Sequence, residues 1–110
     1  MKRRLAMSHE IIIEMAIKRR EVFNNLNEYL QTIKEVVKKI DDKAELYLFG
    51  SVAEKRYAYS SDIDVLILTV AEPARVHLEL WKAGIRDPFE VHVQSPEKAK
   101  LYASNFVKIT

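Results

Sequence analysis

The sequence predicts an α+β fold of two layers, in which a small mixed β-sheet is packed by helices and a long helix comes first. Two observations support this prediction. Patterns typical of helices and strands follow one another in the order α-β-β-α-β-α, with no internal repeat and no flexible linker. The chain has 110 residues, 48% of them hydrophobic and 31% charged, which is typical of one globular domain with a modest core.

The N-terminal third of the chain predicts a long amphipathic helix over about 9–40. This region contains neither Gly nor Pro, and Ser8 is placed to act as its N-cap. The adjacent Asn24 and Asn25 indicate either a bend or a break into two helices. The buried stripe is predicted from apolar residues spaced alternately by four and three, namely Val22, Leu26, Tyr29, Ile33, Val36 and Ile40. The Lys and Arg residues of this helix are expected to lie on a solvated face.

The first turns of this helix carry more apolar residues than one buried stripe requires. Because exposed apolar surface favours association, we expect another chain to cover part of it, either a second copy or a different protein. The residues concerned are Ile11, Ile12, Ile13, Met15 and Ile17.

The whole chain, 1–110, is predicted to form a single domain. Its catalytic core is expected over about 44–104. The stretch "AELYLFGS" predicts a strand that ends at Gly50, and "DIDVLILT" is the most strand-like segment because it is rich in branched residues. In "PFEVHVQ" apolar and polar residues alternate, as in a half-buried strand. The tail "NFVKIT" suggests a short edge strand.

The segments between these strands predict short helices. A loop or one helical turn is expected over 52–61. Pro73 and Gly84 bracket a helix over 74–83, since Pro is favoured in the first turn and Gly just beyond the end. Ser95 followed by Pro96 predicts the start of a last helix.

The composition limits the kinds of site that the chain can carry. It has no cysteine, so disulfides and thiolate metal sites are excluded, and a metal would bind to oxygen or imidazole ligands. The net charge of +2 is too small to indicate nucleic-acid binding. The basic and then apolar start resembles a signal peptide, but Glu10 and Glu14 interrupt its apolar run. No apolar run has the length of a membrane span, so we expect a cytoplasmic protein.

Three carboxylates and a Gly-Ser turn predict a site for phosphate chemistry. Asp62 and Asp64 project from the same side of one predicted strand, because alternate residues of a strand share a side. Glu90 has a similar position near the start of another strand and joins them if the two strands are neighbours. At Gly50 and Ser51 the backbone can approach a phosphate closely. Phosphate, metal and carboxylates together indicate phosphoryl or nucleotidyl transfer.

The pattern Gly50-Ser51, ten residues, then Asp62-Ile63-Asp64-Val65 resembles the signature of the DNA polymerase beta-type nucleotidyltransferase superfamily. The resemblance covers about 46–94, and the length is similar to that of the minimal nucleotidyltransferases (MNT), which are often paired with HEPN proteins in toxin–antitoxin modules. It implies that Asp62 and Asp64 bind Mg²⁺ or Mn²⁺ and that Glu90 completes the metal site and acts as a base. Gly50 and Ser51 would hold the phosphates of ATP.

One part of the family pattern is changed. Members often have a basic residue and a Gly shortly after the Gly-Ser, and this chain has Glu54 and Lys55 there. Lys55 and Arg56 are therefore the candidates for the positive charge beside the phosphates. His92 shares a face with Glu90, and we expect a hydrogen-bonded structural histidine rather than a residue that supports the metal ligands.

Two functions are compatible with the resemblance. In the first, the protein is an antitoxin that transfers AMP from ATP to a hydroxyl, a tyrosine of a HEPN partner. In the second, it is a non-catalytic module of the same fold that neutralises a HEPN protein by forming a complex. The altered Glu54 and Lys55 favour the second, whereas intact Asp62, Asp64 and Glu90 favour the first.

Overall fold

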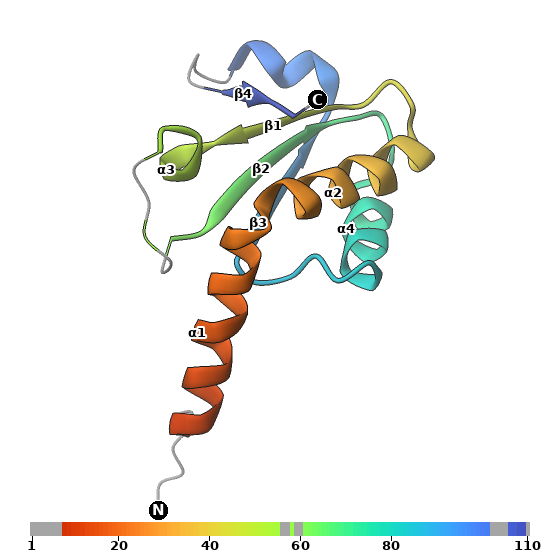
Figure 1. The fold of residues 1–110 in the computed structure, drawn as a ribbon. Helices are drawn as coiled ribbons and strands as arrows, with labels where there is room; N and C mark the ends of the chain where they lie inside the picture. Colours follow the sequence, from red (N-terminus) through yellow and green to blue (C-terminus); the bar gives the residue numbers. More distant parts are fainter. Residues whose placement is uncertain (1–7, 56–57, 59–60, 102–105, 110) are drawn as a thin grey trace, which may run out of the picture.

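The structure is a computed structural model that describes residues 8–55, 58, 61–101 and 106–109 (Figure 1). It confirms the predicted α+β fold, with helices packed on a mixed sheet. Its elements, in order, are α1 (His9–Asn24), α2 (Leu26–Ile40), β1 (Glu45–Phe49), α3 (Gly50–Ala53), β2 (Ile63–Leu68), α4 (Pro73–Lys82), β3 (Phe89–Gln94), the 3₁₀ helix η1 (Pro96–Leu101) and β4 (Val107–Lys108).

The four strands form one sheet in the order β3-β2-β1-β4. β1 is antiparallel to both β2 and β4, whereas β2 and β3 are parallel. β2 therefore has a neighbour on each side. Its residues on both faces are buried, with Asp64 as the partly exposed exception, which explains why its sequence is an almost continuous apolar run. The parallel pairing matters for function because it brings the starts of β2 and β3 to the same end of the sheet.

The predicted N-terminal helix is broken at Asn25, so the alternative of two helices is correct. Asn25 lies outside the helical region of backbone conformation, with φ −123° and ψ 33°. Its side-chain amide donates to the carbonyl of Glu21 at 2.9 Å, which satisfies an acceptor in the last turn of α1. At the other end, Ser8 caps α1 as predicted by accepting from the amide of Ile11 at 3.2 Å. The start of α1 projects away from the sheet (Figure 1).

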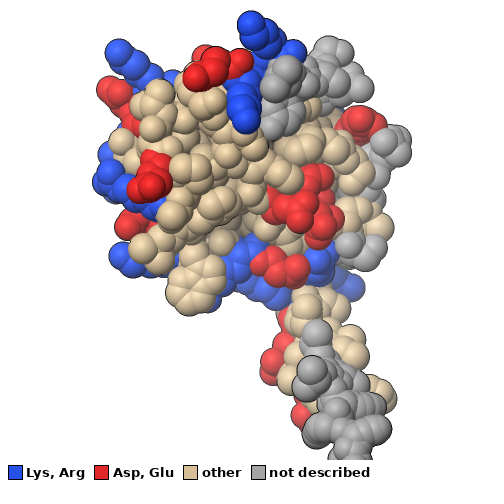
Figure 2. Space-filling view, turned by 180° about the vertical axis from the view of Figure 1, so that it is seen from behind, with Lys and Arg blue, Asp and Glu red and all other residues tan. Residues whose placement is uncertain are grey.

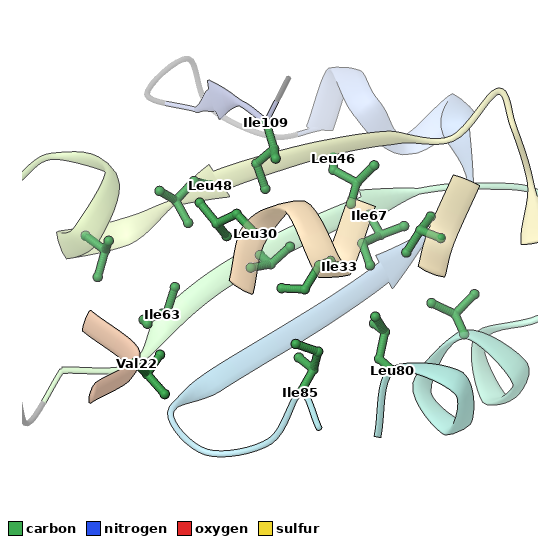
Figure 3. Packing of buried hydrophobic residues seen from close by; sticks show 14 of the residues in the cluster. Val22, Leu30, Ile33, Leu46, Leu48, Ile63, Ile67, Leu80, Ile85 and Ile109 are labelled. Atoms are coloured by element: carbon green, nitrogen blue, oxygen red, sulfur yellow. The ribbon is translucent and has the colours of Figure 1, made fainter. Parts of the chain in front are cut away.

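The hydrophobic core lies between the sheet and the helices α2 and α4 (Figure 3). The inward residues of β2 alternate, so Ile63, Val65 and Ile67 face this core. Asp64 consequently faces the opposite side of the sheet, together with Leu66. The largest core side chains that are almost fully buried include Ile33, Leu46, Ile63, Ile67, Leu80, Val22, Val37, Val65 and Val76.

The remaining elements lie close to their predicted positions. α4 begins at Pro73 and ends one residue before the predicted end. The last helix is present as a 3₁₀ helix rather than an α-helix. Among the described residues, no helix combines the length and the apolar character that a membrane crossing requires.

Candidate active site

Asp64 and Glu90 lie side by side on neighbouring parallel strands. They are register partners of β2 and β3, and Leu66 and His92 form the next pair on the same side. The Asp64 side chain is 22% exposed and that of Glu90 is 59% exposed. Figure 2 shows acidic side chains gathered on the molecule when it is viewed from behind. The predicted convergence of these two carboxylates is therefore present in the fold.

His92 joins this pair. Its Nε2 lies 3.7 Å from Oδ1 of Asp64 and 3.6 Å from Oε1 of Glu90. The three side chains offer ligand atoms that all lie within 4.8 Å of one another. Within the part of the chain that the structure describes, this is the one group of three or more acidic or histidine side chains with such spacing. The arrangement suits a single divalent cation.

The expectation of a hydrogen-bonded structural histidine is wrong for this nitrogen. Nε2 of His92 is shielded from solvent and has no hydrogen-bond partner among the described residues. At 3.6 and 3.7 Å the carboxylate oxygens are too distant for good hydrogen bonds. An unsatisfied buried polar atom is costly and rare in folded proteins, so it indicates a missing partner.

Aromatic side chains hold the imidazole in place. The rings of Phe49 and His92 have centroids 5.2 Å apart and are tilted by 58°. Phe49 stacks in turn on Phe106, with centroids 4.9 Å apart and an angle of 22°. Phe49 is also the register partner of Asp64 across β1 and β2. The aromatic side chains beside the carboxylates thus come from β1, from β3 and from the residue that precedes β4.

Asp62 has a different environment from the other two carboxylates. It precedes β2, its side chain is 56% exposed, and it lies outside the close group of Asp64, Glu90 and His92. Nη2 of Arg19, from α1, lies 3.5 Å from its Oδ1. That Asp62 binds a metal stays a prediction.

The same arginine corrects the view that the basic residues of the first helix only cover a solvated face. The Arg19 side chain is 17% exposed. Its Nη1 donates to the carbonyl of Ser61 at 3.0 Å, and its Nε and Nη2 donate to the carboxylate of Asp87. Arg19 therefore joins α1 to the segments that precede β2 and β3. The sequence pattern did not predict that this basic side chain would lie next to Asp62.

Gly50 packs against Asp64. Its φ is +79°, a conformation that favours glycine, and a Cβ built there would lie 2.5 Å from Oδ2 of Asp64. The side chain of Asp64 therefore gives a reason within the chain for glycine at this position. The sequence alone had suggested another reason, the close approach of a phosphate. Ser51 follows in α3 and is half-buried. Its role in binding phosphate stays a prediction.

Lys55 lines a separate cavity of about 1080 Å³. The cavity lies between α2, the end of α3 and β4, and none of the three predicted carboxylates lines it. Most of its lining is apolar, with Leu30, Leu48 and Ile109 taken from the edge of the core. This cavity is therefore distinct from the group formed by Asp64, Glu90 and His92. Arg56, the other candidate for phosphate binding, lies outside the described residues.

Comparisons with known proteins bear on the family of the chain. The family model for the nucleotidyltransferase domain matches residues 30–108. A crystal structure described as a "putative nucleotidyltransferase" is 34% identical and covers 73% of this chain and 96% of its own, with a TM-score of 0.54. A second one, from Sulfolobus solfataricus, is 22% identical and covers 86% of this chain and 85% of its own, with a TM-score of 0.49. No curated protein matches the chain significantly.

Proposed function

The chain belongs to the nucleotidyltransferase domain family, and on that basis we propose that it transfers AMP from ATP to a hydroxyl group with the help of Mg²⁺ or Mn²⁺. The observation that carries this proposal is the juxtaposition of Asp64 and Glu90 on the parallel strands β2 and β3. Two adjacent carboxylates repel each other, and a cation bound between them removes this repulsion.

The residues present fit a divalent cation. Asp64 and Glu90 offer hard oxygen ligands, and the orphaned Nε2 of His92 faces both of them. We propose that Asp62 contributes from the start of β2. A bound cation would neutralise charge on the triphosphate and polarise the acceptor hydroxyl.

The chain itself supplies binding and proton transfer. Glu90 is the more exposed of the two adjacent carboxylates, so it is better placed to take a proton from an incoming hydroxyl. Gly50 and Ser51 are proposed to hold the phosphates that leave, and Lys55 and Arg56 to add positive charge. Positioning and charge neutralisation, rather than covalent catalysis by a side chain, would provide most of the rate.

We further propose that the acceptor is a tyrosine of a HEPN-type partner, and that the protein acts as an antitoxin by modifying it. The exposed apolar side chains of α1 support a partner, because surface of this kind favours association. Ile12, Ile13 and Ile17 are 52%, 57% and 63% exposed. They lie on the projecting part of α1, where a second chain can approach (Figure 1).

The test is a labelling experiment with ATP that carries a radioactive α-phosphate, Mg²⁺ and a purified HEPN protein that the chain binds. Label and a mass increase equal to adenylate should appear on a partner tyrosine. Asp64→Asn should abolish the label, and Glu90→Gln should slow its appearance by about 10²–10⁴-fold. Asp42→Asn and Glu35→Gln, at exposed positions in the turn after α2 and on α2, are the matched controls and should leave it unchanged.

The same experiment separates the two functions. If Asp64→Asn still neutralises the partner while the label is lost, complex formation is sufficient and the non-catalytic alternative is favoured. If the wild-type protein binds the partner but transfers no nucleotide with Mg²⁺ or Mn²⁺, the catalytic proposal is wrong.

A further inference from the structure

We propose that His92 is a direct nitrogen ligand of the cation, together with Asp64 and Glu90, so that the site selects Mn²⁺ over Mg²⁺. This inference rests on the metal site of the proposed function and adds a ligand that the carboxylate pattern of the sequence does not include. It also names the class of cation, a divalent transition metal.

The geometry suits a shared ion. Ligands about 2.1 Å from a six-coordinate ion are separated by roughly 3 Å when adjacent and about 4.2 Å when opposite. The distances from Nε2 to the two carboxylate oxygens are 3.6 and 3.7 Å, so a shift of about 0.6–0.7 Å would bring these atoms to adjacent ligand positions around one ion. They are too long for direct hydrogen bonds, as expected when an ion, rather than a proton, is to lie between the three atoms.

The lack of a hydrogen-bond partner at Nε2 within the described part of the chain also supports a metal ligand. The whole side chain of His92 is 39% exposed, yet Nε2 itself is shielded from solvent and lacks a hydrogen-bond partner among the residues described. The exposed part of the ring is thus not the part that faces the carboxylates. Because Phe49 packs on the ring, the imidazole is held there instead of turning toward water.

Ligand chemistry then determines which cation is favoured. Mg²⁺ is bound through oxygen ligands and keeps several waters, whereas imidazole nitrogen is a ligand of divalent transition metals, the class to which Mn²⁺ belongs. One imidazole between two carboxylates is such a mixed site. Replacing the nitrogen with an oxygen should therefore narrow the difference in affinity between the two metals.

A different interpretation makes the opposite prediction. If His92 is instead a protonated imidazole that forms ion pairs with Asp64 and Glu90, its charge competes with a cation. Removing the histidine should then strengthen metal binding. The sign of the change in Mn²⁺ affinity therefore distinguishes a ligand from a competitor.

The experiment uses Mn²⁺ alone and Mn²⁺ with inorganic triphosphate, which contains no nitrogen. Electron spin echo modulation of the bound Mn²⁺ should show coupling to ¹⁴N, and labelling the histidines with ¹⁵N should replace it with ¹⁵N coupling. His92→Gln should lose the coupling and weaken Mn²⁺ binding by roughly tenfold or more, measured by calorimetry. Mg²⁺ binding should weaken less. His77→Gln is the matched control, since His77 is exposed on α4, which covers the other face of the sheet.

The outcomes separate this inference from the proposed function. If Mn²⁺ binds to the wild-type protein without nitrogen coupling, or more tightly to His92→Gln, the inference is wrong while the metal site survives. If no Mn²⁺ binds even with triphosphate, both the metal site and the inference fail. The isotope test needs no substitution, so the absence of histidine nitrogen coupling overturns the inference even if His92→Gln does not fold, and coupling that persists in His77→Gln supports it.

Discussion

The guanidinium of Arg19 and the carboxylate of Asp87 are joined by two parallel hydrogen bonds, from Nε to Oδ2 at 3.0 Å and from Nη2 to Oδ1 at 2.8 Å. Such fork-shaped pairs are among the stronger ion pairs because both the charge and the geometry are matched. The same side chain also contacts Ser61 and Asp62, so the end of α1 positions the segments before β2 and β3.

Arg19→Lys should destabilise the protein by about 1–3 kcal/mol, because lysine keeps the charge but cannot make the forked contact. Urea unfolding measures the loss. Arg75→Lys, on the exposed side of α4, is the control and should change stability by less than about 0.5 kcal/mol. Equal effects of the two substitutions would show that Arg19 is only a surface charge.

Gly50→Ala should destabilise the protein more than Gly84→Ala does. Both glycines have positive φ, +79° and +92°, so both substitutions incur backbone strain of about 1–2 kcal/mol. Only Gly50 also has a side chain in the way, since its new Cβ would meet Asp64, whereas a Cβ at Gly84 has nothing within 4 Å.

A double-mutant cycle isolates this clash. In an Asp64→Ala background, Gly50→Ala should cost no more free energy of unfolding than Gly84→Ala. If the excess cost of Gly50→Ala persists without the Asp64 carboxylate, the packing of these two residues is not its source.

Thr69→Val should destabilise the protein and reduce its sensitivity to acid. The Thr69 hydroxyl donates to the Asp41 carboxylate at 2.6 Å, and this bond is the main reason why the pKa of Asp41 lies below its ordinary value. A lowered pKa in the folded state contributes stability that is present above the ordinary pKa and is lost as the pH falls through the folded value. The difference between wild type and Thr69→Val should therefore be about 1–2 kcal/mol near pH 7 and shrink below about pH 4.

Unfolding curves measured between pH 7 and pH 2 test this expectation. Thr32→Val is the control, because the Thr32 hydroxyl donates to the carbonyl of Glu28 within α2 and has no carboxylate partner among the described residues. A difference between wild type and Thr69→Val that stays constant with pH would contradict the role given to Asp41.

Mg²⁺ with ATP should raise the melting temperature of the wild-type protein. A ligand at 100 times its Kd stabilises the folded state by about 2.7 kcal/mol, which shifts the melting temperature of a domain of this size by several degrees. Asp64→Asn should remove the shift, and Asp42→Asn should retain it. An equal shift in Asp64→Asn would place the metal site elsewhere.

The parts of the site that depend on local sequence could be predicted. The alternation in "DIDVLILT" and "PFEVHVQ" places Asp64 and Glu90 on one face, and a parallel pairing of the two strands brings them together. The break at Asn25 could be named only as one of two alternatives, because an Asn pair is also tolerated in a bent helix.

The parts that depend on distant residues could not be predicted. A basic residue on an amphipathic helix is usually solvated, and nothing near Arg19 in the sequence shows that Asp87 will meet it. The environment of His92, whose Nε2 is unsatisfied among the described residues and whose ring packs against Phe49 on another strand, is likewise a tertiary feature. The tolerance of glycine for a close approach predicts phosphate binding at Gly50, whereas in the structure the atom nearest to a Cβ built there is Oδ2 of Asp64.

The contact between Gly50 and Asp64 has a consequence for sequence drift. As long as the carboxylate remains, a side chain at position 50 faces both backbone strain and a clash, so selection acts on the two positions together. A related chain that has lost the acid is released from the clash and retains only the strain, which Asn or Asp tolerates better than other residues. Relatives that have Asn at position 50 and also lack the acid at position 64 would therefore be identified as proteins that keep the fold and have lost the activity.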